Sequence, residues 1–97
     1  MFRRGGERVG FFCISKGGHD AGEYYVIVSA AGSFVHVANG KNKTIAMPKK
    51  KNLAHLEITK TQIPEFDRLL NGKSEMSNLR LAELIKNFKR RKENGGV

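Results

Sequence analysis

Residues 15–28 read SKGGHDAGEYYVIV, a glycine-bearing loop that runs directly into a hydrophobic stretch. The flanking segments, Val9–Ser15 and Tyr24–Ala30, are rich in Val, Ile, Phe and Tyr, and each is short and bounded by glycine, which is typical of strands. The three glycines of the loop permit positive φ angles and a tight path. We therefore predict a hairpin-like loop at residues 16–23 that joins two adjacent strands.

Two further strands are predicted downstream of this hairpin. Phe34–Ala38 has strand composition, and Asn39-Gly40 after it is a strong signal for a two-residue hairpin, because both positions tolerate positive φ. A fourth strand should then run from about Lys41 to Met47. Pro48 is expected to end it, because proline cannot donate a hydrogen bond to the strand ladder.

The chain beyond Pro48 is expected to turn and then to become helical. Lys49–Asn52 should form an exposed basic turn, and Leu53–Ile58 either a short fifth strand or a single helical turn. Pro64 suits the first position of a short helix that ends at Asn71-Gly72. Ser77 is a good N-cap for a second helix. The apolar stripe of that helix comprises Leu81, Ala82, Leu84, Ile85 and Phe88.

Five short strands followed by helices imply a mainly β fold with α elements, in which helices pack outside a small barrel-like sheet or across one end of it. A chain of 97 residues provides one hydrophobic core. We divide it into a flexible basic N-terminus at 1–6, a barrel at 7–60 and a helical extension with a basic tail at 61–97. The first segment is either an ordinary frayed terminus or one that orders on a partner.

Charge points to an anionic partner. Eighteen Lys and Arg residues against nine acids give a formal net charge of +9, far more than solubility requires. No stretch joins a basic face to the broad apolar face of a membrane-surface helix, so nucleic acid is favoured over lipid. Without a long apolar run or a secretory signal, we expect a cytoplasmic protein. Cys13, among apolar neighbours, is expected to be a reduced core residue.

Catalysis finds little support in the sequence. Gly17-Gly18 lacks the Gly-Lys-Ser or Gly-Lys-Thr ending of a phosphate loop, and Ser15, His19 and Asp20 lie too close together in sequence to indicate a triad. One cysteine and no ligand spacing argue against a metal site. We therefore expect neither an enzyme nor a bound cofactor, and no small-molecule substrate.

Residues 15–28 resemble the KOW motif, in which a loop with an Asp, a spacer and a glycine precedes a hydrophobic strand; Gly22 matches the signature glycine. Val37–Lys41 and Pro48–Leu56 resemble the second half of one branch of that family. That branch comprises bacterial KOW-domain RNA-binding proteins similar to the eukaryotic and archaeal large-subunit ribosomal protein numbered fourteen. The resemblance covers residues 7–59 and implies an SH3-like barrel that binds rRNA or tRNA and associates with the ribosome, above all the large subunit.

The loop itself departs from the basic character usual in that branch, because it carries His19, Ala21 and Glu23. We expect it to contribute shape and backbone N–H groups more than charge, with Gly18, Asp20 and Gly22 as its structural residues. Phosphate affinity should come mainly from lysines that can converge on one edge of the barrel. These are Lys41, Lys43, Lys49, Lys50 and Lys51. The alternative is a solvated face that only keeps the protein soluble.

Two features, a tyrosine pair and a basic cluster, each allow two different roles. Of Tyr24 and Tyr25, one should enter the core, while the other stacks on a base or covers the barrel rim. The basic cluster near the C-terminus either contacts RNA or is the solvated face of a packed helix. It comprises Lys86, Lys89, Arg90, Arg91 and Lys92. The full set of expected RNA contacts is Lys16, His19, Tyr24, Lys41, Lys43, Lys49, Lys50, Lys51, Asn52, Lys89, Arg90 and Arg91.

RNA binding at the ribosome or translation apparatus is thus the function we expect. Two alternatives stand beside it. One is a transcription-linked KOW adaptor, which usually has a second domain for which this chain has no room. The other is an SH3-like module that binds acidic peptides.

Overall fold

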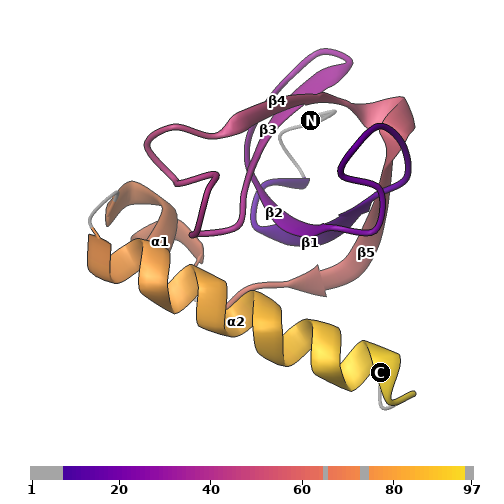
Figure 1. Cartoon of the computed structure of the whole chain (residues 1–97). Coiled ribbons are helices and arrows are strands. Elements are labelled where there is room, and N and C mark those ends of the chain that lie inside the picture. The colour runs from indigo at the N-terminus through magenta and orange to yellow at the C-terminus, as the bar shows by residue number, and fades with distance from the viewer. Residues whose placement is uncertain (1–7, 65, 73–74, 96–97) are drawn as a thin grey trace.

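The computed structural model of the protein describes residues 8–64, 66–72 and 75–95. Five strands form a curled sheet and two helices follow them (Figure 1). The strands are β1 (Phe11–Ser15), β2 (Tyr24–Ala31), β3 (Phe34–Ala38), β4 (Lys49–Asn52) and β5 (Leu56–Gln62). A 3₁₀ turn, η2 (Leu53–His55), joins the last two strands, and the helices are α1 (Phe66–Gly72) and α2 (Glu75–Glu93). The expected small β-barrel-like fold with C-terminal helices is confirmed.

The sheet is antiparallel throughout, with the strand order β4-β3-β2-β1-β5. Residues 16–23 join β1 to β2 as a hairpin loop, as predicted, with Ile14 opposite Tyr24. A β-bulge between Ile27 and Ser29 shifts the register of β2 against β3, and another irregularity lies in β1 against β5. Bulges increase local twist, which helps a sheet of short strands to curl.

The concave side of the sheet encloses one apolar cluster, built from alternate residues of the strands. Its buried members are Cys13, Tyr25, Ile27, Val35, Val37 and Leu56. The expected core position of Cys13 is confirmed, and burial raises the pKa of its thiol to about 12. Because the reactive form of cysteine is the thiolate, Cys13 is chemically quiet at neutral pH.

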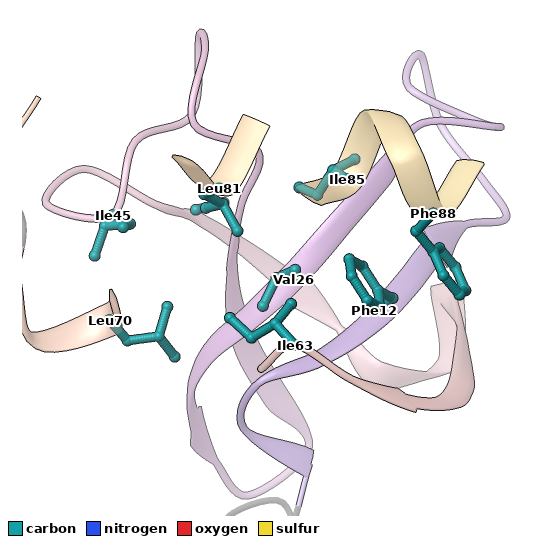
Figure 2. Close-up of a cluster of buried hydrophobic side chains, with 9 residues drawn as sticks. Phe12, Val26, Ile45, Ile63, Leu70, Leu81, Ile85 and Phe88 are labelled. Atoms are coloured by element: carbon teal, nitrogen blue, oxygen red, sulfur yellow. The ribbon is translucent and has the colours of Figure 1, made fainter. Parts of the chain in front are cut away.

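The convex side of the sheet is covered in part by α2, and a second apolar cluster fills the space between them. Figure 2 shows Leu81, Ile85 and Phe88 of the helix facing Phe12 and Val26 of the sheet. The Phe12 and Phe88 rings stack with their centroids 4.1 Å apart. The predicted apolar stripe of this helix is therefore correct, and the helix belongs to the same core as the barrel.

The prediction was wrong between Asn39 and Asn52. Asn39-Gly40 does not form a two-residue hairpin, and no strand occupies Lys41–Met47; residues 39–48 form an irregular loop that leads to β4. The expected basic turn at Lys49–Asn52 is β4 itself, which pairs with β3. Of the two possibilities for Leu53–Ile58, both occur in succession, because η2 is followed directly by β5.

Tertiary contact explains why the loop replaces the hairpin. A Cβ atom on Gly40, whose φ is +80°, would meet the Asn78 carbonyl oxygen of α2. The Asn78 side chain also accepts a hydrogen bond of 2.8 Å from the Ile45 amide. Close packing of the backbone against α2 thus requires glycine here, and it draws the chain away from β3.

The element ends were less well predicted than the elements. The first strand begins at Phe11 rather than Val9, after Gly10 at φ +90°. The short helix begins at Phe66, two positions after Pro64, and α2 begins at Glu75, so Ser77 lies inside the helix and is not its N-cap. The expected flexible segment 1–6 lies outside the described residues. In the part of the chain that is described, no helix has the length and apolar character needed to cross a membrane.

Replacement of Phe88 by alanine tests whether α2 is integral to the fold. The ring is almost fully buried against Phe12, so we expect Phe88→Ala to lower the free energy of unfolding by about 3–5 kcal/mol. Chemical denaturation followed by circular dichroism measures the change. Asn87→Ala, at an exposed neighbouring position, is the control. Equal stability of the two variants would show that the helix is a dispensable appendage.

Candidate nucleic-acid interface

The Asp20 carboxylate holds the loop between β1 and β2 in place. Its Oδ1 atom accepts hydrogen bonds from Ser15 Oγ at 2.9 Å and from Lys51 Nζ at 2.8 Å. Its Oδ2 atom accepts from Tyr25 Oη at 2.8 Å and from Lys49 Nζ at 2.9 Å. The donors come from β1, β2 and β4, so one side chain joins the loop to three strands.

Electrostatics favour the ionised form of this carboxyl group. Burial alone would raise the pKa of Asp20, but hydrogen bonds from Lys51, Lys49, Tyr25 and Ser15 hold that pKa well below its usual range. Burial and the adjacent Asp20 raise the pKa of the Tyr25 phenol, which therefore remains a hydrogen-bond donor. Within the described residues, every fully buried side-chain polar atom has a hydrogen-bond partner.

Backbone geometry of the loop explains its glycines. Gly18 and Gly22 have φ angles of +81° and +92°, which L-residues with a side chain rarely adopt. These turns let the Gly22 and Glu23 amides donate to the Ser15 and Asp20 carbonyl oxygens, at 2.8 and 2.9 Å. Asp20 and the two glycines thus shape the loop.

The three consecutive lysines of β4 do not form one basic surface. Lys49 and Lys51 both point to Asp20, and Lys51 is only 8% exposed. Lys50 lies on the opposite side of the strand, exposed to solvent, with its Nζ atom 4.5 Å from the centroid of the Phe34 ring. Lys51 is consequently shielded from solvent, and Lys49 is half-buried in its ion pair.

Lys41 and Lys43 project from the ordered turn at Asn39. The Asn39 Oδ1 atom accepts hydrogen bonds from the Lys41 amide at 2.9 Å and the Lys43 amide at 3.1 Å, while its Nδ2 atom donates to Asn42 Oδ1. The turn separates the two lysines. Lys41 borders a groove beside α2, whereas Lys43 borders a cavity that also contacts His36. The five lysines therefore do not converge on a single edge of the barrel.

The remaining predicted contacts are dispersed. Lys16 and His19 are exposed on the loop, and the Asn52 side chain caps η2 by accepting from the Ala54 amide at 2.8 Å. Tyr25 enters the core, while Tyr24 packs edge-on against Phe88 of α2.

The basic cluster of α2 lies beside Tyr24. Lys89 Nζ is 5.5 Å from the centroid of the Tyr24 ring, and Phe88 of the same helix packs edge-on against that ring. Arg90 and Arg91 are exposed in the last turns of α2. Tyr24 thus packs against α2, and the cation beside its ring belongs to that helix.

Sequence reasoning overlooked an aromatic side chain at the sheet surface. Phe34 is 39% exposed and lies two residues before His36 on the same side of β3. His36 pairs with Lys50 across the strands, and its Nδ1 atom is 3.1 Å from Ser29 Oγ. Strict alternation of exposed and buried side chains along residues 34–38 would have placed Phe34 and His36 on one face of the sheet and the buried Val35 and Val37 on the other face.

The Asp20 cluster can be tested by removing one charge. Asp20→Asn leaves the buried Lys51 ammonium without an opposite charge, so we expect it to lower the free energy of unfolding at pH 7 by about 3–5 kcal/mol. The folded pKa is depressed, so the wild-type contribution is complete above the ordinary carboxyl pKa of about 3.9 and is lost as pH falls from there toward the folded pKa.

Denaturation curves measured from pH 7 down to pH 3 should thus show the difference between Asp20→Asn and wild type shrinking at the acidic end. Glu23→Gln is the matched control, because Glu23 is an exposed acid in the same loop, and it should change stability by no more than about 0.5 kcal/mol. If Asp20→Asn were as mild as this control, the ion pairs would not support the fold.

Comparison with known proteins assigns no identity to these residues. No protein-family model matches the chain, and no curated protein matches it.

Proposed function

We propose that the protein binds RNA and associates with the ribosome or the translation apparatus, recognising rRNA or a tRNA-like structured RNA. The proposal is supported by cations outside the Asp20 cluster, of which Lys41 and Lys50 are exposed and Lys43 is half-buried. Lys41, Lys43 and Lys50 make no ion pair with another described residue. Cations in this state are available for phosphates, and their release of counterions drives binding to nucleic acid.

Lysine side chains of this kind position an RNA backbone without reading its bases. A compact ammonium on a flexible stem accepts many phosphate geometries. The Asn39 turn fixes the backbone from which Lys41 and Lys43 extend, and β4 fixes that of Lys50. Phosphates of one folded RNA could therefore be held at defined separations, which suits a structured target.

A groove beside α2 favours a second candidate function, the binding of an acidic peptide. Met76 and Leu79 of α2 are 76% and 61% exposed, and Lys41 and Lys86 flank them. Glu83, at the same groove, is paired with Arg80 at 2.9 Å. A peptide with acidic residues around an apolar one would complement this surface.

The salt dependence of RNA binding tests the lysines directly. On single-stranded RNA, each phosphate contact contributes about 0.7 to the slope of log K against log salt. Combined replacement of Lys41, Lys43 and Lys50 by alanine should therefore reduce that slope by about 2. Fluorescence anisotropy titrations over a series of salt concentrations provide the measurement.

Lys60→Ala is the control for charge removal, because Lys60 is exposed on β5, at the far end of the strand order from β4. Lys60→Ala should change the slope less than the replacement of any one of Lys41, Lys43 and Lys50 by alanine does. A triple variant with wild-type affinity and slope would reject the assignment of phosphate contacts to these three lysines.

Crosslinking in cells, with and without RNase treatment, distinguishes the two candidates. RNA binding at the ribosome predicts crosslinks to rRNA or tRNA, and co-sedimentation with large subunits that survives moderate salt. RNase-insensitive capture that is reduced by Leu79→Asp but not by the single replacement Lys50→Ala would instead support the peptide groove.

A further inference from the structure

The convex face of the sheet is only partly covered by α2, and beyond the helix it opens into a cavity of about 910 Å³. The cavity lies between β2, β3, the loop 39–48 and α1, on the side of the molecule where α1 meets the loop (Figure 1). Side chains that line it include Val28, His36, Lys43, Met47, Phe66 and Asp67. Its volume is in the range of pockets that hold small organic ligands or cofactors.

Both apolar and polar groups line this cavity. Val28 and Phe66 offer apolar walls, and Met47, which is 76% exposed, forms part of the rim. Lys43 supplies a cation from the loop, whereas Asp67 supplies a hydrogen-bond acceptor from α1. Such a combination suits a ligand with a flat apolar body, exocyclic amino groups and an attached negative charge.

The sheet surface continues from the cavity to an aromatic platform. His36, at the cavity, is flanked by Phe34 two residues earlier on its own strand and by Lys50 directly opposite on β4. Lys50 lies over the Phe34 ring, and it is exposed and makes no ion pair with a described residue. A base arriving at Phe34 can therefore displace the ammonium toward the phosphate attached to that base.

We infer that the cavity and the adjacent Phe34–Lys50 surface bind unpaired nucleotides of RNA, with one base in the cavity and its neighbour on Phe34. This inference rests on the proposed RNA-binding function and specifies the part of the RNA that is recognised. Bases can enter a pocket or stack on an aromatic ring only where they are not paired, as in loops, bulges and single strands. Lys43 and Lys50 hold the phosphates on either side of His36.

Two methionines make this assignment testable at single-residue level. Met47 is at the cavity and Met76 is at the groove beside α2, and both are 76% exposed. In protein labelled with carbon-13 at the methionine methyl groups, a short single-stranded RNA should shift the NMR signal of Met47 and leave that of Met76 in place. A shift at Met76 alone would overturn the inference.

Affinity for paired and unpaired RNA provides the second measurement. Phe34→Leu keeps an apolar side chain but removes the stacking surface, and Ala46→Trp places a large ring at an exposed position of the cavity lining. Each should weaken binding of a single-stranded oligonucleotide by about fivefold to tenfold. Binding of a duplex with the same number of phosphates should be unchanged, and so should the salt dependence. Asn87→Ala, at an exposed position of α2, is the control.

The outcomes separate this inference from the function on which it rests. If Phe34→Leu and Ala46→Trp bind single-stranded RNA as wild type does, while the triple lysine variant has a reduced salt slope, RNA binding stands and the base site is rejected. If the wild-type protein bound neither the single-stranded oligonucleotide nor the duplex, both the base site and the RNA-binding function would be rejected. The thermal unfolding midpoint of each variant establishes that it is folded.

Discussion

The ion pairs of Asp20 with Lys49 and Lys51 connect parts of the sheet that do not touch through backbone hydrogen bonds. β4 is separated from β1 by β3 and β2 in the strand order, yet a carboxylate in the β1–β2 loop bonds to two of the three lysines of β4, Lys49 and Lys51. The Tyr25 hydroxyl donates to the same carboxylate from the concave core. One acidic side chain therefore fixes the loop and the edge strand together, and the curled shape of the sheet depends on it.

This arrangement also decides which cations can serve another purpose. A buried ion pair stabilises the fold little by itself, because removing two charges from water costs nearly as much free energy as their attraction returns. Removing one partner of the pair, however, leaves an uncompensated charge in the interior. Lys51 is thereby committed to the fold. Because side chains alternate along a strand, Lys50 points to the face of β4 opposite to Lys49 and Lys51. On that outer face it lies beside the Phe34 ring. The run of three lysines thus divides into two that stabilise the fold and one that is exposed to solvent.

Local patterns predicted much of this fold and failed where distant segments meet. The hairpin loop, the first three strands and the apolar stripe of α2 were correctly predicted, because strand composition bounded by glycine and apolar residues at helical spacing are local signals. Asn39-Gly40 misled, since Gly40 is required by the approach of the Asn78 carbonyl on α2 and not by a two-residue turn. The β4 strand was missed because Lys49 and Lys51 are paired with Asp20, and no local rule shows that partner. The cavity beside His36 was equally hidden, because loop 39–48 and α1 border it together.

The position of α2 determines how much of the convex face is left for a ligand. Stacking of Phe88 on Phe12 anchors the helix near β1, and the hydrogen bond from Ile45 to Asn78 ties the loop 39–48 to its first turns. The apolar residues of the sheet under the helix are thereby buried, whereas Phe34 is beyond its reach. Because the same contacts hold the loop that borders the cavity, its walls are formed before any ligand arrives. Little conformational entropy would then be lost on binding, which is the condition under which a few well-placed contacts give useful affinity.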